Sequence, residues 1–160
     1  MVLARLQWQV EPLHPHLFAF QRQRSTTTCL LTLLGALRSR SGLVIFLDME
    51  KAFELASPLA ILDTFTTKGV KGKLLCWLRE YLRGLAARVR FQGHFSSMQP
   101  HQLGTPQGGC LSPFLFNILI ENLLHADYAP GSLLFCYADD LALYLPPLPP
   151  PMVCVPRPQN

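Results

Sequence analysis

Apolar residues recur along the chain in short runs separated by serine, proline and glycine, and this pattern predicts alternating helices and strands. Leucines on one side of the segment after Ser25 predict a helix, because serine and threonine cap helix N-termini. The pairs Ser57-Pro58 and Ser112-Pro113 each predict a helix start with the serine as N-cap. The expected helices cover residues 3–10, 28–38, 58–67, 73–83 and 114–125. The last of these is apolar on nearly every side, so we expect it to be buried.

Further apolar runs predict strands. In the run 42–47 both the odd and the even positions are apolar, which is typical of a strand covered on two faces, and an aspartate follows the run. The runs 133–136 and 141–144 flank a short acidic turn and predict a β-hairpin. The segment 87–91 alternates polar and apolar residues, which predicts a half-exposed strand paired with residues 96–103.

Three aspartates lie at the ends of these predicted strands. Asp139 and Asp140 form the hairpin turn, and Asp48 closes the first strand. Two adjacent carboxylates between hydrophobic strands cost on the order of several kcal/mol to desolvate unless a cation or hydrogen bonds compensate. Carboxylates suit hard cations such as Mg²⁺, so the three acids predict a metal site wherever the sheet brings them together. A solvated acidic turn, and a helix N-cap at Asp48, are the alternative interpretations.

The composition bounds the partners and the compartment. The 160 residues suffice for one domain at most, and 49% hydrophobic against 15% charged residues provides a rich core. A net charge of +4 permits a nucleic-acid partner without requiring one. Five scattered cysteines without a C-x-x-C pair predict reduced thiols and no disulfide-linked partner. No apolar run suits a membrane span and no signal pattern opens the chain, so we expect an intracellular protein of the nucleus or cytoplasm that is not secreted and has no membrane partner.

Three segments, in this order, resemble catalytic motifs of the reverse transcriptases, and most nearly those of non-LTR retrotransposons. They are Phe46–Glu54 (FLDMEKAFE), Gly104–Pro113 (GTPQGGCLSP) and Tyr137–Asp140 (YADD). The segment Phe18–Thr26 is also similar to the sequence that precedes the palm in these elements. The resemblance implies an α/β (α+β) polymerase palm, with a small, largely antiparallel sheet, helices packed on one face and an acidic hairpin at the active site.

The same resemblance divides the chain into three parts. Residues 1–17 would be a partial fingers or connecting segment, and residues 18–145 the palm-type domain. Residues 146–160 would be a proline-rich disordered tail, because a polyproline run does not pack. The fingers and thumb of this family are not found in the sequence, so we expect the chain alone to extend primers poorly.

The implied activity is that of an RNA-directed DNA polymerase acting by two-metal nucleotidyl transfer. Its partners would be an RNA template, a DNA primer and deoxynucleoside triphosphates. Asp48, Asp139 and Asp140 would be the catalytic residues and would hold two Mg²⁺ ions, or Mn²⁺ in their place. The other implied contacts are those with the nucleotide, by Met49, Glu50, Phe53, Gln107 and Gly108, and those with nucleic acid, by Arg22 and Arg24.

Several of these roles have structural alternatives. Met49 and Glu50 would act through their main-chain amides, and Phe53 would screen the sugar 2′ position, with plain core packing as its alternative. For Gln107 the alternative is a glycine-rich loop with a spare amide, and for the two arginines it is solvated charge. As a whole, the chain could instead be a catalytically inactive retroelement remnant that at most binds nucleic acid. A nucleotide cyclase on the same fold is a third interpretation, which the Pro-Gln-Gly motif disfavours.

Overall fold

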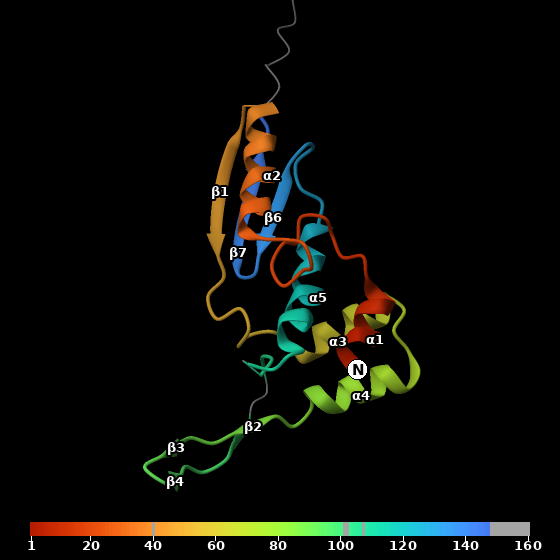
Figure 1. Ribbon diagram of the computed structural model, residues 1–160, viewed down its shortest axis with the longest axis vertical. Coiled ribbons are helices and arrows are strands. Elements are labelled where there is room, and N and C mark those ends of the chain that lie inside the picture. Colours follow the sequence, from red (N-terminus) through yellow and green to blue (C-terminus); the bar gives the residue numbers. More distant parts are fainter. Residues whose placement is uncertain (40, 101–102, 107, 148–160) are drawn as a thin grey trace, which may run out of the picture.

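The computed structural model describes residues 1–39, 41–100, 103–106 and 108–147 (Figure 1). These residues form a small sheet with a helix packed along one face, a helical body at one end of the sheet, and a thin arm that projects from the body. The helices are α1 (Val2–Val10), α2 (Thr26–Ser39), α3 (Pro58–Thr67), α4 (Gly72–Leu82) and α5 (Ser112–Leu124). The sheet consists of β1 (Leu43–Asp48), β6 (Leu133–Tyr137) and β7 (Asp140–Leu145), and the arm contains β2 (Ala86–Ala87), β3 (Arg90–Phe91), β4 (His94–Phe95) and β5 (Gln99–Pro100).

The two Ser-Pro pairs begin helices in different ways. Ser57 caps α3 as predicted, because its hydroxyl accepts a hydrogen bond from the Ala60 N–H at 3.4 Å. Ser112 is instead the first residue of α5, after Leu111, and its hydroxyl donates to the carbonyl of Pro106. The predicted N-cap at Ser112 is therefore wrong, since the preceding loop folds back and takes up the serine side chain.

The strand order of the sheet is β1-β7-β6, and both pairings are antiparallel. The central strand β7 is thus the last strand in the sequence, while its neighbour β1 comes about a hundred residues earlier. The segment before α2 adds a bridge on the outer side of β6, where Leu17 pairs with Cys136. The predicted small antiparallel sheet and its acidic hairpin are confirmed.

Helices cover both faces of the sheet at β6. On one face, α2 lies over the sheet and runs along the strands (Figure 1), and it packs Leu33 against Phe135, Ala142 and Tyr144. On the other face, the alternate residues of the strands, among them Cys136, join the core that includes α5. The structure therefore adds a second covered face to the single one that was expected.

Strand β1 is exposed along almost its whole length. The exposed fractions are 59% for Leu43, 71% for Phe46 and 47% for Leu47. The prediction that this strand is covered on two faces is wrong. The physical reason is that β1 lies at the edge of the sheet, and α2 packs toward β6 and β7 rather than over it.

The main core lies among α1, α3, α4 and α5. Its fully buried members include Leu6, Ile61, Phe65, Leu78 and Leu115. The N-terminal segment contributes Leu6 and Leu17 to this core, so it packs as part of the same body as α5. The division into parts at residue 17 stays a prediction, and the proline-rich segment from residue 148 onward lies outside the described residues. Among the described helices, none is long and apolar enough to cross a membrane.

The arm covers residues 86–100, all of them exposed, and projects from the lower end of the molecule in Figure 1. It contains two short antiparallel ladders, β2 with β5 and β3 with β4, around a turn at Gln92-Gly93 with positive φ at both residues. The single strand predicted over 87–91 is thus split into two pieces and exposed on both faces, because nothing packs against it.

Candidate active site

The sheet brings the three aspartates to one end. Asp48, the last residue of β1, lies directly opposite Asp140, the first residue of β7. Asp139 occupies the tight turn just before β7, next to Ala138 with φ of 56°. The Met49 N–H donates a hydrogen bond to the Asp139 carbonyl at 3.3 Å, which ties the end of β1 to that turn. Segments that are about ninety positions apart in the sequence are therefore joined at these acids.

Asp48 and Asp140 form a like-charged pair across the two strands. Directly opposite residues of an antiparallel pair have Cβ atoms about 4.5–5.5 Å apart, and like charges there are destabilising. Asp48 and Asp140 are exposed, while Asp139 is half-buried. A bound divalent cation would offset the repulsion between them, and carboxylate oxygens are the donors that Mg²⁺ prefers.

The side chains themselves are not gathered into a metal cage. Within the described residues, no group of three His, Cys, Asp or Glu side chains is arranged to hold a metal ion. The structure does not show the three carboxylates gathered close enough to share metals, so the metal site stays a prediction. Repulsion between like charges disfavours such a cluster when no cation is bound. The backbone positions and the donor chemistry nevertheless fit a hard cation, because Asp48 and Asp140 lie directly opposite each other and carboxylate oxygens are suitable ligands.

Cys136 lies behind the acidic turn, where its thiol donates to the Ala138 carbonyl at 3.3 Å. Burial, followed by the neighbouring Cys29, Asp139 and Asp140, raises the pKa of Cys136 to about 12. The thiol is thus neutral at physiological pH. It adds no negative charge to the acidic turn and does not compete as a thiolate ligand.

A cavity of about 380 Å³ lies between α2 and the sheet, and both Asp48 and Asp140 line it. Its other lining residues are mainly apolar, among them Leu30, Phe46 and Phe135. The volume is at the lower end of the range for small-molecule sites. The carboxylates are therefore reached from an open, largely apolar hollow.

The glycine-rich motif lies against the segment that follows Asp48. Gly104 N–H donates to the Ala56 carbonyl at 2.7 Å, and Thr105 N–H donates to the Phe53 carbonyl at 3.0 Å. Gly104 has φ of +89°, and a Cβ there would lie 2.7 Å from the carbonyl oxygen of Glu54, so only glycine fits. This close approach places the second motif directly beside the first.

The predicted nucleotide contacts differ in their surroundings. The Phe53 ring stacks on Phe116 with centroids 4.5 Å apart and is partly buried, so its position is fixed by packing. The amide of Met49 is engaged by Asp139 and is not free for a triphosphate, which disagrees with the expected role. The Glu50 side chain is exposed, as is Gly108. Gln107 lies outside the described residues.

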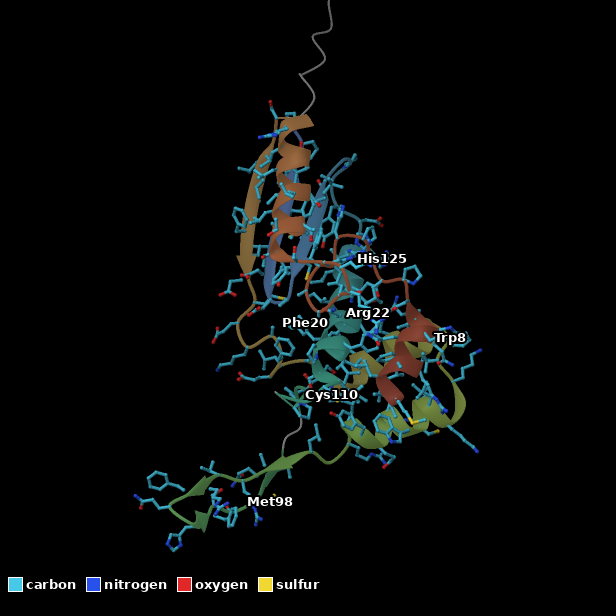
Figure 2. The ribbon with its side chains drawn as sticks, in the orientation of Figure 1. Trp8, Phe20, Arg22, Met98, Cys110 and His125 are labelled. Carbon is cyan, nitrogen blue, oxygen red and sulfur yellow. The ribbon has the colours of Figure 1, made fainter. Side chains whose placement is uncertain are left out.

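The two arginines predicted to contact nucleic acid also differ in their hydrogen bonding and exposure. The Arg24 guanidinium donates to the carbonyls of His14 at 3.4 Å, Leu17 at 3.0 Å and Pro15. It therefore holds the segment before α2 in place, which argues for a structural role rather than the expected phosphate contact. Arg22 (labelled in Figure 2) is exposed and remains accessible to a ligand.

Sequence reasoning missed a buried polar centre on α5. Glu121 is 2% exposed, and its carboxylate accepts from the His14 N–H at 2.8 Å and lies 2.7 Å from Lys68 Nζ. One turn earlier, the buried Asn117 donates to the Ala19 carbonyl at 2.9 Å. Burial, with the nearby His16 and His125, lowers the pKa of His14. The available signal was polar residues four apart in an otherwise apolar helix, and their role is to tie the N-terminal segment to α5.

Comparison with known proteins identifies the chain. The model of the family described as "Reverse transcriptase (RNA-dependent DNA polymerase)" matches residues 1–147. The chain belongs to this reverse transcriptase family. The family is one of RNA-directed DNA polymerases, which are nucleotidyltransferases.

One protein similar to this reverse transcriptase domain is a retrotransposon polyprotein. The domain is 28% identical over 120 residues to the "Retrovirus-related Pol polyprotein from type-1 retrotransposable element R2" of Popillia japonica, a match over 69% of the chain and 20% of that relative. The chain thus spans about a fifth of the relative's length. This similarity agrees with the expected non-LTR retrotransposon type.

A solved structure shares the fold of the domain. It is an apo telomerase from Candida tropicalis truncated from its C-terminal domain, with a TM-score of 0.66. The match covers 89% of this chain and 33% of that one, at 14% sequence identity. At this identity the likeness concerns the fold alone, and it confirms the α/β polymerase palm.

Proposed function

We propose that this chain is the catalytic palm of a retroelement polymerase, which extends a DNA primer on an RNA template with deoxynucleoside triphosphates. Asp48, Asp139 and Asp140 would hold two Mg²⁺ ions, or Mn²⁺. The observation that carries the proposal is the register of the sheet, which sets Asp48 opposite Asp140. The hydrogen bond from the Met49 N–H to the Asp139 carbonyl adds a second link between the same two segments. Bound divalent cations would stabilise the charge that develops on the attacking and leaving oxygens.

The surrounding residues would contribute position and selectivity. The Phe53 ring is held by its stack on Phe116 and an edge contact with Phe20, at centroid distances of 4.5 and 6.2 Å. A ring that cannot move aside makes an effective steric wall, so Phe53 would exclude a sugar 2′-hydroxyl. The bonds from Gly104 and Thr105 support a place for the glycine-rich loop beside the same nucleotide. The neutral Cys136 thiol would leave the negative charge of the site to its carboxylates.

Metal binding by the chain itself tests the proposal. Electron paramagnetic resonance counts the Mn²⁺ ions bound by the unaltered chain and by Asp139→Asn. Asp63→Asn on α3 is the matched control, because it removes an exposed carboxylate that belongs to a helix and not to the sheet. We expect Asp139→Asn to lose bound Mn²⁺ and the control to keep it. Equal binding by both variants would remove these aspartates from the site.

Catalysis is tested in a fusion that adds the flanking polymerase segments of a related element, since positioning of primer and template requires more than a palm. Magnesium-dependent primer extension on an RNA template should then depend on Asp139. Metal bound by the aspartates without any extension by the folded fusion would favour the inactive remnant that at most binds nucleic acid.

A further inference from the structure

The projecting arm carries positive charge with no acid to balance it. From Tyr81 to Ile120 the chain has no Asp or Glu, while Arg88 and Arg90 both lie on the arm. The two arginines on the arm make no salt bridge within the described residues. No residue of the arm belongs to either hydrophobic core, so packing does not explain its composition.

One face of the arm combines arginine with an aromatic ring. Arg90 lies directly opposite Phe95 in the β3–β4 ladder, so the two side chains share a face. Arg88 precedes Arg90 by two positions, and its guanidinium carbon lies 4.0 Å from the centroid of the Phe95 ring, against 5.7 Å for that of Arg90. We call Arg88, Arg90 and Phe95 the arginine face. The side chains of the arm stand clear of the helical body in Figure 2, where Met98 is labelled.

We propose that the arginine face binds the single-stranded RNA template. Guanidinium groups contact phosphate oxygens in two-pronged hydrogen bonds, and bases stack on exposed aromatic rings with little regard to sequence. Phe95 is 52% exposed and so has surface available for stacking. The cation–π contacts hold both guanidiniums over one ring, which lowers the entropy lost when they meet a strand.

The position of the arm in the chain also suits template binding. It leads from α4 directly into the glycine-rich loop that lies against Phe53. The arm is thus part of the segment that joins the first two motifs, and a strand bound to it would be held by the residues that lead into the second motif. That the ligand is the template rests on the proposed function, but binding by the arm is measured without metal or nucleotide.

The experiment measures fluorescence anisotropy of a labelled, unstructured RNA of about 16 nucleotides with the whole chain in EDTA. The double variant Arg88→Gln/Arg90→Gln is compared with Lys71→Gln/Lys73→Gln, which removes two exposed charges before and within α4. We expect the arm variant to bind RNA about tenfold or more weakly. The slope of log affinity against log salt concentration should also become shallower by about 1.4, because each of the two lost phosphate contacts on a single strand accounts for roughly 0.7. The lysine control should retain both values.

Phe95→Leu separates stacking from charge. It should weaken binding about tenfold while leaving the salt dependence unchanged, because no phosphate contact is lost. Thermal melting of each variant should match that of the unaltered chain, since the arm contributes nothing to the core. These results together would support the arginine face as an RNA site.

Other outcomes would overturn the proposal. Equal losses in the arginine and lysine variants would indicate unspecific charge attraction. Binding of single-stranded DNA but not RNA would refute the assignment to the template. Altered oligomeric state with unchanged RNA affinity would make the arm a protein contact. Asp139→Asn should keep its RNA affinity, so a failure of the arm and a failure of the proposed active site are distinguishable.

Discussion

The like-charged pair of Asp48 and Asp140 makes a prediction whose sign depends on divalent metal. In metal-free buffer, Asp140→Asn removes the repulsion across the strands and should stabilise the chain. Such pairs contribute about 0.2–1 kcal/mol, and solvent screening of two exposed carboxylates favours the lower half of that range. A gain of about 0.5 kcal/mol corresponds to a rise in Tm of roughly 1–2 °C for a chain of this size.

Divalent metal should reverse the order of stability. A ligand that binds only the folded state stabilises it by about 2.7 kcal/mol at 100 times its dissociation constant. The unaltered chain should gain stability with Mn²⁺, while Asp140→Asn, which lacks one carboxylate, should gain much less. Thermal melting followed by circular dichroism, in EDTA and in saturating Mn²⁺, measures both effects. Asp63→Asn is the control that should follow the unaltered chain in both buffers.

Two results would refute this reasoning separately. If Asp140→Asn gains no stability in EDTA, the two carboxylates do not repel across the strand pair as their register requires. If the unaltered chain gains nothing from Mn²⁺, the aspartates do not form a site that binds metal in the folded chain.

Three further predictions concern other residues. In primer extension by a fusion that adds the flanking polymerase segments of a related element, Phe53→Val should raise ribonucleotide incorporation about tenfold or more, and unchanged discrimination would return the ring to a packing role. Glu121→Gln should cost about 1–3 kcal/mol in urea unfolding, because Lys68 then loses its buried partner; an unchanged midpoint would contradict the ion pair. Because the pKa of Cys136 is raised to about 12, the folded thiol stays protonated where the unfolded one ionises, so stability should fall by about 1.4 kcal/mol per pH unit between pH 9 and pH 12. Urea unfolding of Cys136→Ala should show a shallower decline, whereas Cys76→Ala, at an exposed thiol, should not.

Local sequence signals predicted where helices and strands lie better than they predicted which of them are covered by other elements. The Ser57-Pro58 pair defined the start of α3, and the apolar run 114–125 was recognised as buried, because capping and all-round hydrophobicity act within one helix. Exposure of β1 was not predictable in this way. Apolar residues on both parities indicate a strand, but whether another element covers it depends on segments elsewhere in the chain.

The candidate site shows the same limit. The apolar runs that end in these acids were interpreted as neighbouring strands, which predicted that Asp48 would meet the acidic hairpin, and the backbone register agrees. The uses of Met49 and Arg24 were missed, because each is satisfied by carbonyl groups brought close only by the fold. Glu121 was missed because one acid in an apolar helix does not reveal its partners on other elements.

The order of the strands has a consequence for how the site is made during translation. The central strand β7 is the last of the sheet to leave the ribosome, so β1 waits without its partner while about ninety residues are added. At about 5–20 residues per second, this interval lasts roughly 5 to 20 s. During that time the backbone edge of β1 that later pairs with β7 is open to chaperones or to other nascent chains. Asp48 can meet Asp140 only when synthesis of the sheet is complete, so a chain interrupted before residue 140 never assembles its acids.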